Sequence, residues 1–356
     1  MYWRFRPKAD ARKNQKVGVK GGLALLPKST GVTLGPRQES TAGFEYLSHN
    51  HMTDTTATKI ESTSLSYLGG VALVLMAGVF WSTMGLGIRS IETANVWQIL
   101  FFRSWALGTF LFVLITFRTG YKPILTIRRV GIAGAIGGMG LVFAFAGGIF
   151  AIQTTTVANA MFLFASAPFL AAIFGWVILR ESVRKATWVA MIFAFVGIVI
   201  MVLNGIAAGR LIGNLAAILS ALGFAVFTIA LRWGKLGDML PAVFLAGVFS
   251  IIVSTIVCYT MDYGFSIPAN DIMIAFALGV FQVGLGLAIF TIGSRVVPAA
   301  ELALLSMTEV LLGPLWVWLF MGETASFYTL VGGFILMLAI AGNALSGLRH
   351  KPIPVI

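Results

Sequence analysis

Three ionisable side chains, Arg103, Glu301 and Glu309, are the residues best placed to do chemistry, because they lie inside long apolar runs. A charge at the centre of a bilayer costs about 2.5–3.5 kcal/mol on insertion scales, so such residues persist mainly where they are paired or used. Glu301 and Glu309 are eight residues apart, which in a helix is about 12 Å along the axis. They can therefore face one cavity without touching.

Two interpretations are open for each of these residues. Glu309, midway along its run, is either a proton or substrate-cation partner or one half of a structural ion pair with Arg103. For Arg103 we favour a structural role. For Glu301, near one end of its predicted helix, we favour a role at an entrance or in helix capping.

The elements that must position these side chains are membrane helices. Hydrophobic residues make up 58% of the 356 residues and charged residues 11%, which excludes a soluble enzyme and a disordered chain. Cys258 is the only cysteine, which excludes a disulfide scaffold. Apolar runs of about 20 residues cross the roughly 30 Å hydrocarbon core as helices, and their continuity excludes a barrel. The ten predicted spans are roughly 66–88, 96–118, 130–152, 156–179, 184–204, 211–232, 241–262, 271–294, 298–321 and 326–347.

The net charge of +12 reflects topology rather than an acidic partner. With the N-terminus inside, the breaks and tail on the cytoplasmic side hold twelve Lys or Arg residues, and the opposite breaks hold only Arg89 and Arg210. The positive-inside rule therefore predicts that both termini are cytoplasmic. We expect an integral multi-pass protein of a bacterial cytoplasmic (inner) membrane. Its expected partners are the lipid bilayer and a small-molecule substrate, not nucleic acid, and its oligomeric state is left open.

The two ends of the chain differ from the apolar remainder. Residues 1–65 are basic and polar without helical or alternating periodicity, and we expect a disordered tail. Met52 begins a short polar stretch of the kind that precedes a first membrane helix, so it is a candidate start of translation. Whether residues 1–51 are translated is left open. Residues 348–356 are expected to form a cytoplasmic tail.

An internal repeat organises the spans. Residues 156–205 match residues 298–347 at an ungapped offset of 142, which aligns Glu181 with Glu323. Matched residues fall at the same points of matched spans. Both glutamates lie at loop edges, where we expect them to cap or anchor helix ends.

A looser match relates Trp81–Arg89 to Phe224–Arg232 at an offset of 143. Each half then has five spans, and because five is odd the second half must be inverted in the membrane. We therefore predict an all-α membrane protein of two inverted five-helix repeats, 66–204 and 211–347. Inverted repeats are typical of alternating-access carriers, whose substrate site lies near the midplane.

The repeat adds two candidates for substrate binding or coupling. Asn159 occupies the position that matches Glu301 in the other half. It is either a substrate contact or an interhelical hydrogen-bonding residue. Trp81 either stacks on a ligand or closes a gate, or it is a packing aromatic.

Catalytic, metal and nucleotide motifs are missing from the sequence. The three histidines, His49, His51 and His350, lie outside the spans, which excludes a His-ligated metal or a triad within the membrane. No phosphate-binding loop occurs. We therefore expect no enzymatic activity, no metal and no cofactor. Two alternatives stay open: an intramembrane enzyme using Glu301 and Glu309, and a non-transporting membrane scaffold.

Short motifs stand at matching points of the spans. The first span contains Phe80-Trp81-Ser82, the second contains Arg103, and the fourth runs from Ala165-Ser166-Ala167-Pro168 to Glu181. The ninth span repeats this last form and ends at Glu323. In their order and spacing these motifs resemble the drug/metabolite transporter superfamily of the EamA type.

The resemblance covers about residues 66–347 and implies a ten-helix carrier of a small metabolite. It points to an amino acid, a related metabolite or a drug-like compound, moved by export with possible proton coupling, and the alternative is uptake or exchange. Where the family's second repeat often has Glu-Pro, this chain has Glu309-Val310, with the proline displaced to Pro314. Helix bending at that point is therefore not carried over.

Overall fold

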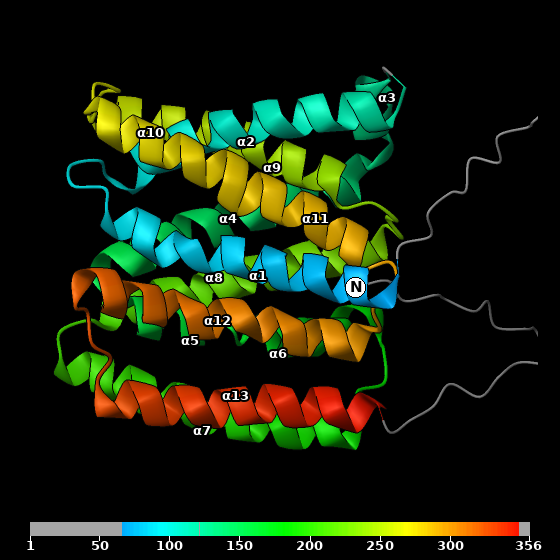
Figure 1. The fold of residues 1–356 in the computed structure, drawn as a ribbon, viewed down its shortest axis with the longest axis vertical. Helices are drawn as coiled ribbons and strands as arrows, with labels where there is room; N and C mark the ends of the chain where they lie inside the picture. Colours follow the sequence, from blue (N-terminus) through cyan, green and yellow to red (C-terminus); the bar gives the residue numbers. More distant parts are fainter. Residues whose placement is uncertain (1–65, 121, 349–356) are drawn as a thin grey trace, which may run out of the picture. The chain divides into compact units, whose positions relative to one another are not determined.

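The computed structural model describes residues 66–120 and 122–348, which are nearly all helical (Figure 1). The predictions for the tails at 1–65 and 348–356, and for a start at Met52, fall outside the described residues. Leu348 is the exception, since it ends the last helix.

The first repeat has one short helix and one helix break that were not predicted. Its helices are α1 (Tyr67–Arg89), α2 (Val96–Arg118), α3 (Pro123–Arg129), α4 (Gly131–Thr154), α5 (Val157–Phe164), α6 (Ala167–Leu179) and α7 (Lys185–Ala207). The fourth span divides into α5 and α6 immediately before Pro168. Proline lacks the N–H that would continue the helical ladder and clashes with the preceding turn, which accounts for the break.

The second repeat departs from the prediction in a different span. Its helices are α8 (Leu211–Trp233), α9 (Leu240–Thr260), α10 (Ala269–Ala277), the π-helix η1 (Leu278–Leu285), α11 (Gly286–Gly293), α12 (Ala299–Met321) and α13 (Phe327–Leu348). The eighth span is therefore α10, η1 and α11 joined end to end. Pro314 lies inside α12, which continues past it as one helix, so the matched fourth and ninth spans differ in continuity.

Ten segments among the described residues are long and apolar enough to cross a membrane, and they coincide with the ten predicted spans. The chain is an integral multi-pass membrane protein. Successive spans run in opposite directions, so the bundle has two ends. We call them the Ser66 end and the Ser90 end, after the residues that flank α1. α1 runs toward the Ser90 end and α8 runs toward the Ser66 end, as inverted repeats require.

The two repeats pack together through equivalent contacts between their helices. α1 of the first repeat packs against α12 of the second, and α8 packs against α5 and α6, so each first helix meets the other repeat's fourth span. α1 also lies against η1 and α11, just as α8 lies against α4. Two further contacts pair equivalent helices, α2 with α9 and α7 with α13 (Figure 1). The interface between the repeats is therefore pseudo-symmetric.

Glycines let α4 and α8 approach to backbone contact. A Cβ atom added at Gly223 would lie 2.5 Å from the Gly140 carbonyl oxygen and 2.7 Å from the Ala144 nitrogen. Membrane helices gain little from the hydrophobic effect and associate by such close packing. This contact explains the small residues that recur along α4.

Gly223→Ala should lower the free energy of unfolding by roughly 1–3 kcal/mol, because the added methyl group meets backbone atoms that cannot move aside. The measurement is the thermal unfolding midpoint of the full chain in detergent. Gly342→Ala is the matched control, since a Cβ there meets no heavy atom within 4 Å. Equal midpoints for the two variants would show that α4 and α8 are not packed so closely.

Candidate functional site

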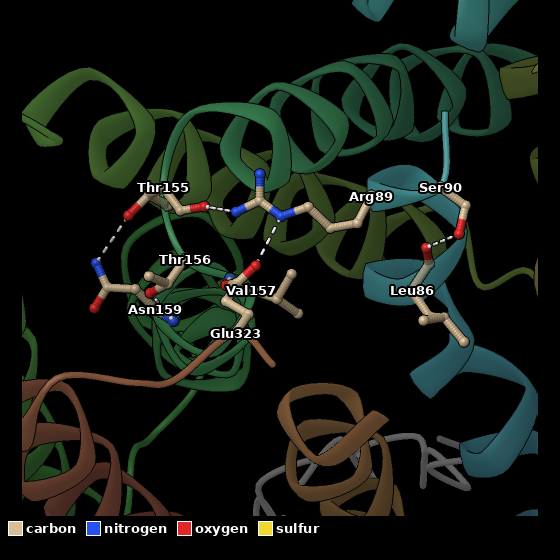
Figure 2. Close-up of polar contacts among 8 residues, drawn as sticks. All are labelled: Leu86, Arg89, Ser90, Thr155, Thr156, Val157, Asn159 and Glu323. Carbon is tan, nitrogen blue, oxygen red and sulfur yellow. Dashed lines mark hydrogen bonds and ion pairs between the residues drawn. The ribbon is translucent and has the colours of Figure 1, made fainter. Parts of the chain in front are cut away.

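An ion pair closes the interface between the repeats at the Ser90 end (Figure 2). Arg89, at the end of α1, donates from Nε to Glu323 Oε2 at 2.9 Å. The second Glu323 oxygen accepts the Val157 backbone N–H at 2.6 Å, one of the first N–H groups of α5, which have no partner within the helix. Arg89 also donates from NH2 to the Thr155 carbonyl at 2.7 Å. One arginine and one glutamate thus bind α1, the start of α5 and the loop after α12 together.

A second ion pair closes the Ser66 end, between Arg232 at the end of α8 and Glu181 just after α6. Gly175 leaves room for it, since a Cβ at that position would lie 3.2 Å from Glu181 Oε2. Arg232 Nε is buried and has no partner among the described residues. In both ion pairs the side chains are only 21–27% exposed.

The two ion pairs are equivalent under the inverted repeat. The sequence match aligns Arg89 with Arg232 and Glu181 with Glu323, and the structure pairs the arginine of each repeat with the glutamate of the other. The glutamates therefore anchor helix ends, but in ion pairs that cross between the repeats. The alignment shows the equivalence, and the predicted topology places each pair at one end of the bundle, whereas the contacts themselves depend on the packing of α1 and α8.

Asn159 lies inside a buried polar network close to the Ser90 ion pair. Its Nδ2 donates to Asn214 Oδ1 of α8, and its Oδ1 accepts from Thr329 Oγ1 of α13 at 3.3 Å. Thr155 donates from Oγ1 to the same Asn214 oxygen at 3.0 Å. Asn159 is only 3% exposed, and its amide joins α5 to α8 and α13. These contacts match the interhelical interpretation of this residue.

Glu301 and Trp81 both make contacts between helices. Glu301, in the first turn of α12, accepts a hydrogen bond from the Tyr67 hydroxyl and so joins the starts of α1 and α12 at the Ser66 end. The Trp81 ring packs on Phe290 at a centroid distance of 5.1 Å. A Cβ at Gly286 would lie 2.6 Å from Trp81 Nε1, so the indole fills the space over that glycine. Ligand contact by Trp81 stays a prediction.

Arg103 is buried in α2, with 3% of its surface exposed, and has no carboxylate partner. Its NH2 donates to Gln282 Oε1 of η1 at 3.2 Å, and its guanidinium lies 4.9 Å from the centre of the Phe145 ring. Nε and NH1 have no hydrogen-bond partner. Both ion pairs found among the described residues lie elsewhere, so the alternative of an Arg103–Glu309 ion pair is wrong for this structure.

Glu309 lies in α12 where that helix crosses α1. A Cβ at Gly78 of α1 would lie 3.2 Å from Thr308 Cβ and 3.7 Å from the Glu309 nitrogen. The side chain is partly buried, and no hydrogen bond or ion pair ties its carboxylate to any other residue of the described chain. α12 packs against α1, α13 and α5, whereas α2 packs against α9, α10, η1 and α4. Arg103 and Glu309 therefore lie on helices that do not pack against each other.

Asp271 and Gln282 contribute to the site region and were not predicted. Asp271, in the first turn of α10, is 2% exposed and accepts from the Thr93 hydroxyl at 2.7 Å. It also accepts the backbone N–H groups of residues 92, 93 and 94, so it organises the loop between α1 and α2. An acidic residue at the first position of a predicted span was a usable signal for Asp271. No sequence pattern marks Gln282, whose contact follows from the π-helix.

Comparisons with known proteins agree with this architecture. The family model described as the EamA-like transporter family matches residues 68–203 and again residues 211–345. The chain is 23% identical over 299 residues to human solute carrier family 35 member G1, an alignment that covers 78% of this chain and 79% of the relative. A solved crystal structure superposes with a TM-score of 0.58 at 19% identity, over 81% of this chain and all of that one, which supports the fold alone.

Asn159→Ala should lower the free energy of unfolding by roughly 1–3 kcal/mol, because it leaves Asn214 and Thr329 with buried polar groups that have lost a partner. Thr329→Val removes the hydroxyl that contacts Asn159 and Ser326, and it should cost about 1 kcal/mol because Ser326 keeps its hydrogen bond from Asn204. Thermal unfolding of both variants in detergent checks this order. An Asn159→Ala variant with wild-type stability would remove the structural interpretation and favour a role in binding.

Proposed function

We propose that this chain, which belongs to the EamA-like transporter family, is a secondary carrier that moves a small metabolite across a membrane by alternating access. The proposed substrate is an amino acid, a related metabolite or a drug-like compound, and the proposed direction is export. The proposed location is a bacterial cytoplasmic membrane. The excess of Lys and Arg in the breaks at the Ser66 end supports a cytoplasmic position for that end.

The observation that carries this proposal is the occurrence of equivalent ion pairs at opposite ends of the bundle. Arg89–Glu323 holds the repeats together at the Ser90 end, and Arg232–Glu181 does so at the Ser66 end. A carrier that opens to one side must separate its repeats there and keep them closed at the other side. Equivalent ion pairs across the interface supply both closures with the same chemistry.

These closures are weak enough to break and reform in a transport cycle. Ion pairs at exposed sites typically contribute no more than about 1 kcal/mol, and the side chains involved are partly exposed. A hydrogen bond to a charged group contributes roughly 1.5–3 kcal/mol. The bond between Glu323 and the Val157 N–H therefore makes the Ser90 end the firmer of the two.

Glu309 is the proposed proton-coupling residue. Its carboxylate lies within a span, is partly buried, and has no protein partner among the described residues. A charge in that position is costly, and protonation removes the charge. Proton uptake at Glu309 can therefore be linked to the separation of α1 and α12, which meet at Thr308 and Gly78.

Glu309→Gln should abolish the dependence of transport on a pH gradient, because the amide resembles the protonated acid and cannot release a proton. Full-length protein is reconstituted into proteoliposomes loaded with a metabolite mixture, and efflux is followed by mass spectrometry with and without the gradient. We expect one class of solute to leave faster under the gradient with the wild type only.

Other outcomes would contradict specific parts of the proposal. Equal exchange of solutes without a gradient would limit Glu309 to a structural role and make the protein an exchanger or facilitator. Absence of any solute movement in correctly folded protein would count against the carrier itself and favour a scaffold.

Arg89→Gln should open the Ser90 end by removing its ion pair while the Glu323 cap on α5 is kept. The reporter is a cysteine at Met161, a buried residue of α5 whose side chain packs against Gly313 of α12. Cys258, which is also buried, is replaced by alanine in the same chain. A membrane-impermeant maleimide should label it several-fold faster from the Ser90 side. Arg232→Gln, which opens the opposite end, should slow that labelling.

Arg210→Gln is the matched control for this experiment. Arg210 is an exposed arginine that lies, like Arg89, at the Ser90 end of the bundle, and it forms no ion pair among the described residues. Its replacement should leave labelling unchanged. Identical rates in all three variants would show that the ion pairs do not close the bundle.

A further inference from the structure

The guanidinium of Arg103 is a buried cation that forms no ion pair with any residue in the part of the chain that the structure describes. It is 3% exposed, and it is the only Lys or Arg side chain in the described chain that is buried to this extent. Its hydrogen-bonding groups at Nε and NH1 have no partner. Removal of a charge from water is compensated only where an opposite charge or a full set of hydrogen bonds replaces the water. In this structure Arg103 has neither.

The carboxylates of the neighbouring helices do not supply the missing partner. Asp271 of α10 is already engaged by the Thr93 hydroxyl and by the backbone of the loop after α1. Glu309 lies on α12, which packs elsewhere in the bundle. The described residues therefore supply no anionic partner for Arg103, and a ligand is the partner that we consider.

The surroundings of Arg103 hold the guanidinium in place and leave donors free. Gln282 accepts one hydrogen bond, and Phe145 covers the cation at 4.9 Å. Gln282 is presented by the π-helix η1, and π-helical turns occur frequently at functional sites. Gly279 of η1 allows this approach, since a Cβ there would lie 2.3 Å from the Arg103 carbonyl oxygen. Because Gln282 is neutral, it can be displaced by a stronger acceptor.

Arginine donors match the planar oxygens of carboxylate and phosphate groups. With a single buried cation present, one negative charge is neutralised completely, whereas a phosphate dianion would retain a net charge in an apolar setting. We propose that Arg103 is the anion-binding residue of the carrier and that the transported substrate bears one carboxylate, which takes up the free guanidinium N–H groups. This assignment rests on the proposed carrier function.

The proposal and a structural role for Arg103 predict opposite effects of Arg103→Gln. If Arg103 serves a substrate, its neutral replacement removes an uncompensated buried charge, so the thermal midpoint without ligand stays equal or rises. If Arg103 holds the helices together, the midpoint falls. Arg118→Gln, at the exposed end of the same helix, is the matched control and should behave as the wild type does.

Binding is tested with L-leucine, L-phenylalanine and L-lactate, each beside the amide that replaces its carboxylate, and with inorganic phosphate as the dianion. Full-length protein is used for ligand-dependent thermal shifts and for uptake into proteoliposomes. We expect at least one acid to bind at least tenfold more tightly than its amide. Arg103→Gln should lose at least tenfold in affinity for that acid, and Arg103→Lys should retain weakened binding.

Several results would overturn the assignment. Equal binding of acids and amides by the wild type would do so without any variant, as would tighter binding of phosphate than of every acid. A fall in the midpoint of Arg103→Gln that Arg103→Lys repairs would assign a structural role. Transport of the amides without preference for acids would refute the carboxylate class and leave the carrier standing, whereas no transport of any solute would count against the carrier.

Discussion

The bundle depends on one constraint, which is that polar groups buried between its two repeats must find partners within the protein, because hydrocarbon offers none. Most of these groups find their partner in the opposite repeat. Glu323 binds Arg89 and caps α5, Asp271 holds the loop after α1, and Asn159 bonds to α8 and α13. Neither repeat can satisfy its own polar groups, so the two halves form one structure through contacts that lie mainly at its ends.

The exceptions to this rule lie within the spans. Arg103 has buried donors without a partner, and the Glu309 carboxylate has no hydrogen bond or ion pair among the described residues. The helices that carry them, α2 and α12, do not pack against each other. Most other buried polar groups of the interface have hydrogen-bond partners within the protein. The free donors of Arg103 and the free carboxylate of Glu309 are therefore the groups that a solute or a proton can bind. In the proposed carrier, the ion pairs close the two ends of the bundle, and Arg103 and Glu309 bind the substrate and the proton between them.

The sequence predicts the large features of this fold because each span is long enough to leave an unambiguous apolar run. It also aligns Arg89 with Arg232 and Glu181 with Glu323. The predicted topology places Arg89 and Glu323 at one end and Arg232 and Glu181 at the other. It does not show that the members of each pair meet, because that contact requires α1 to pack against α12 and α8 to pack against α6. The π-helix around Gln282 and the continuity of α12 past Pro314 depend on local backbone geometry, which apolar periodicity does not encode.

The equivalence of the two ion pairs has a consequence for how such a chain can be built. A single five-helix unit that carried both the arginine and the glutamate would, as an antiparallel pair of identical copies, close both ends with one set of residues. Once the two copies are joined in one chain, their sequences can change independently. Asn159, which aligns with Glu301, shows that equivalent positions now differ. Substitutions can then change the residues at the two ends separately, so the two ends of a joined chain can differ in chemistry where those of a symmetric dimer cannot.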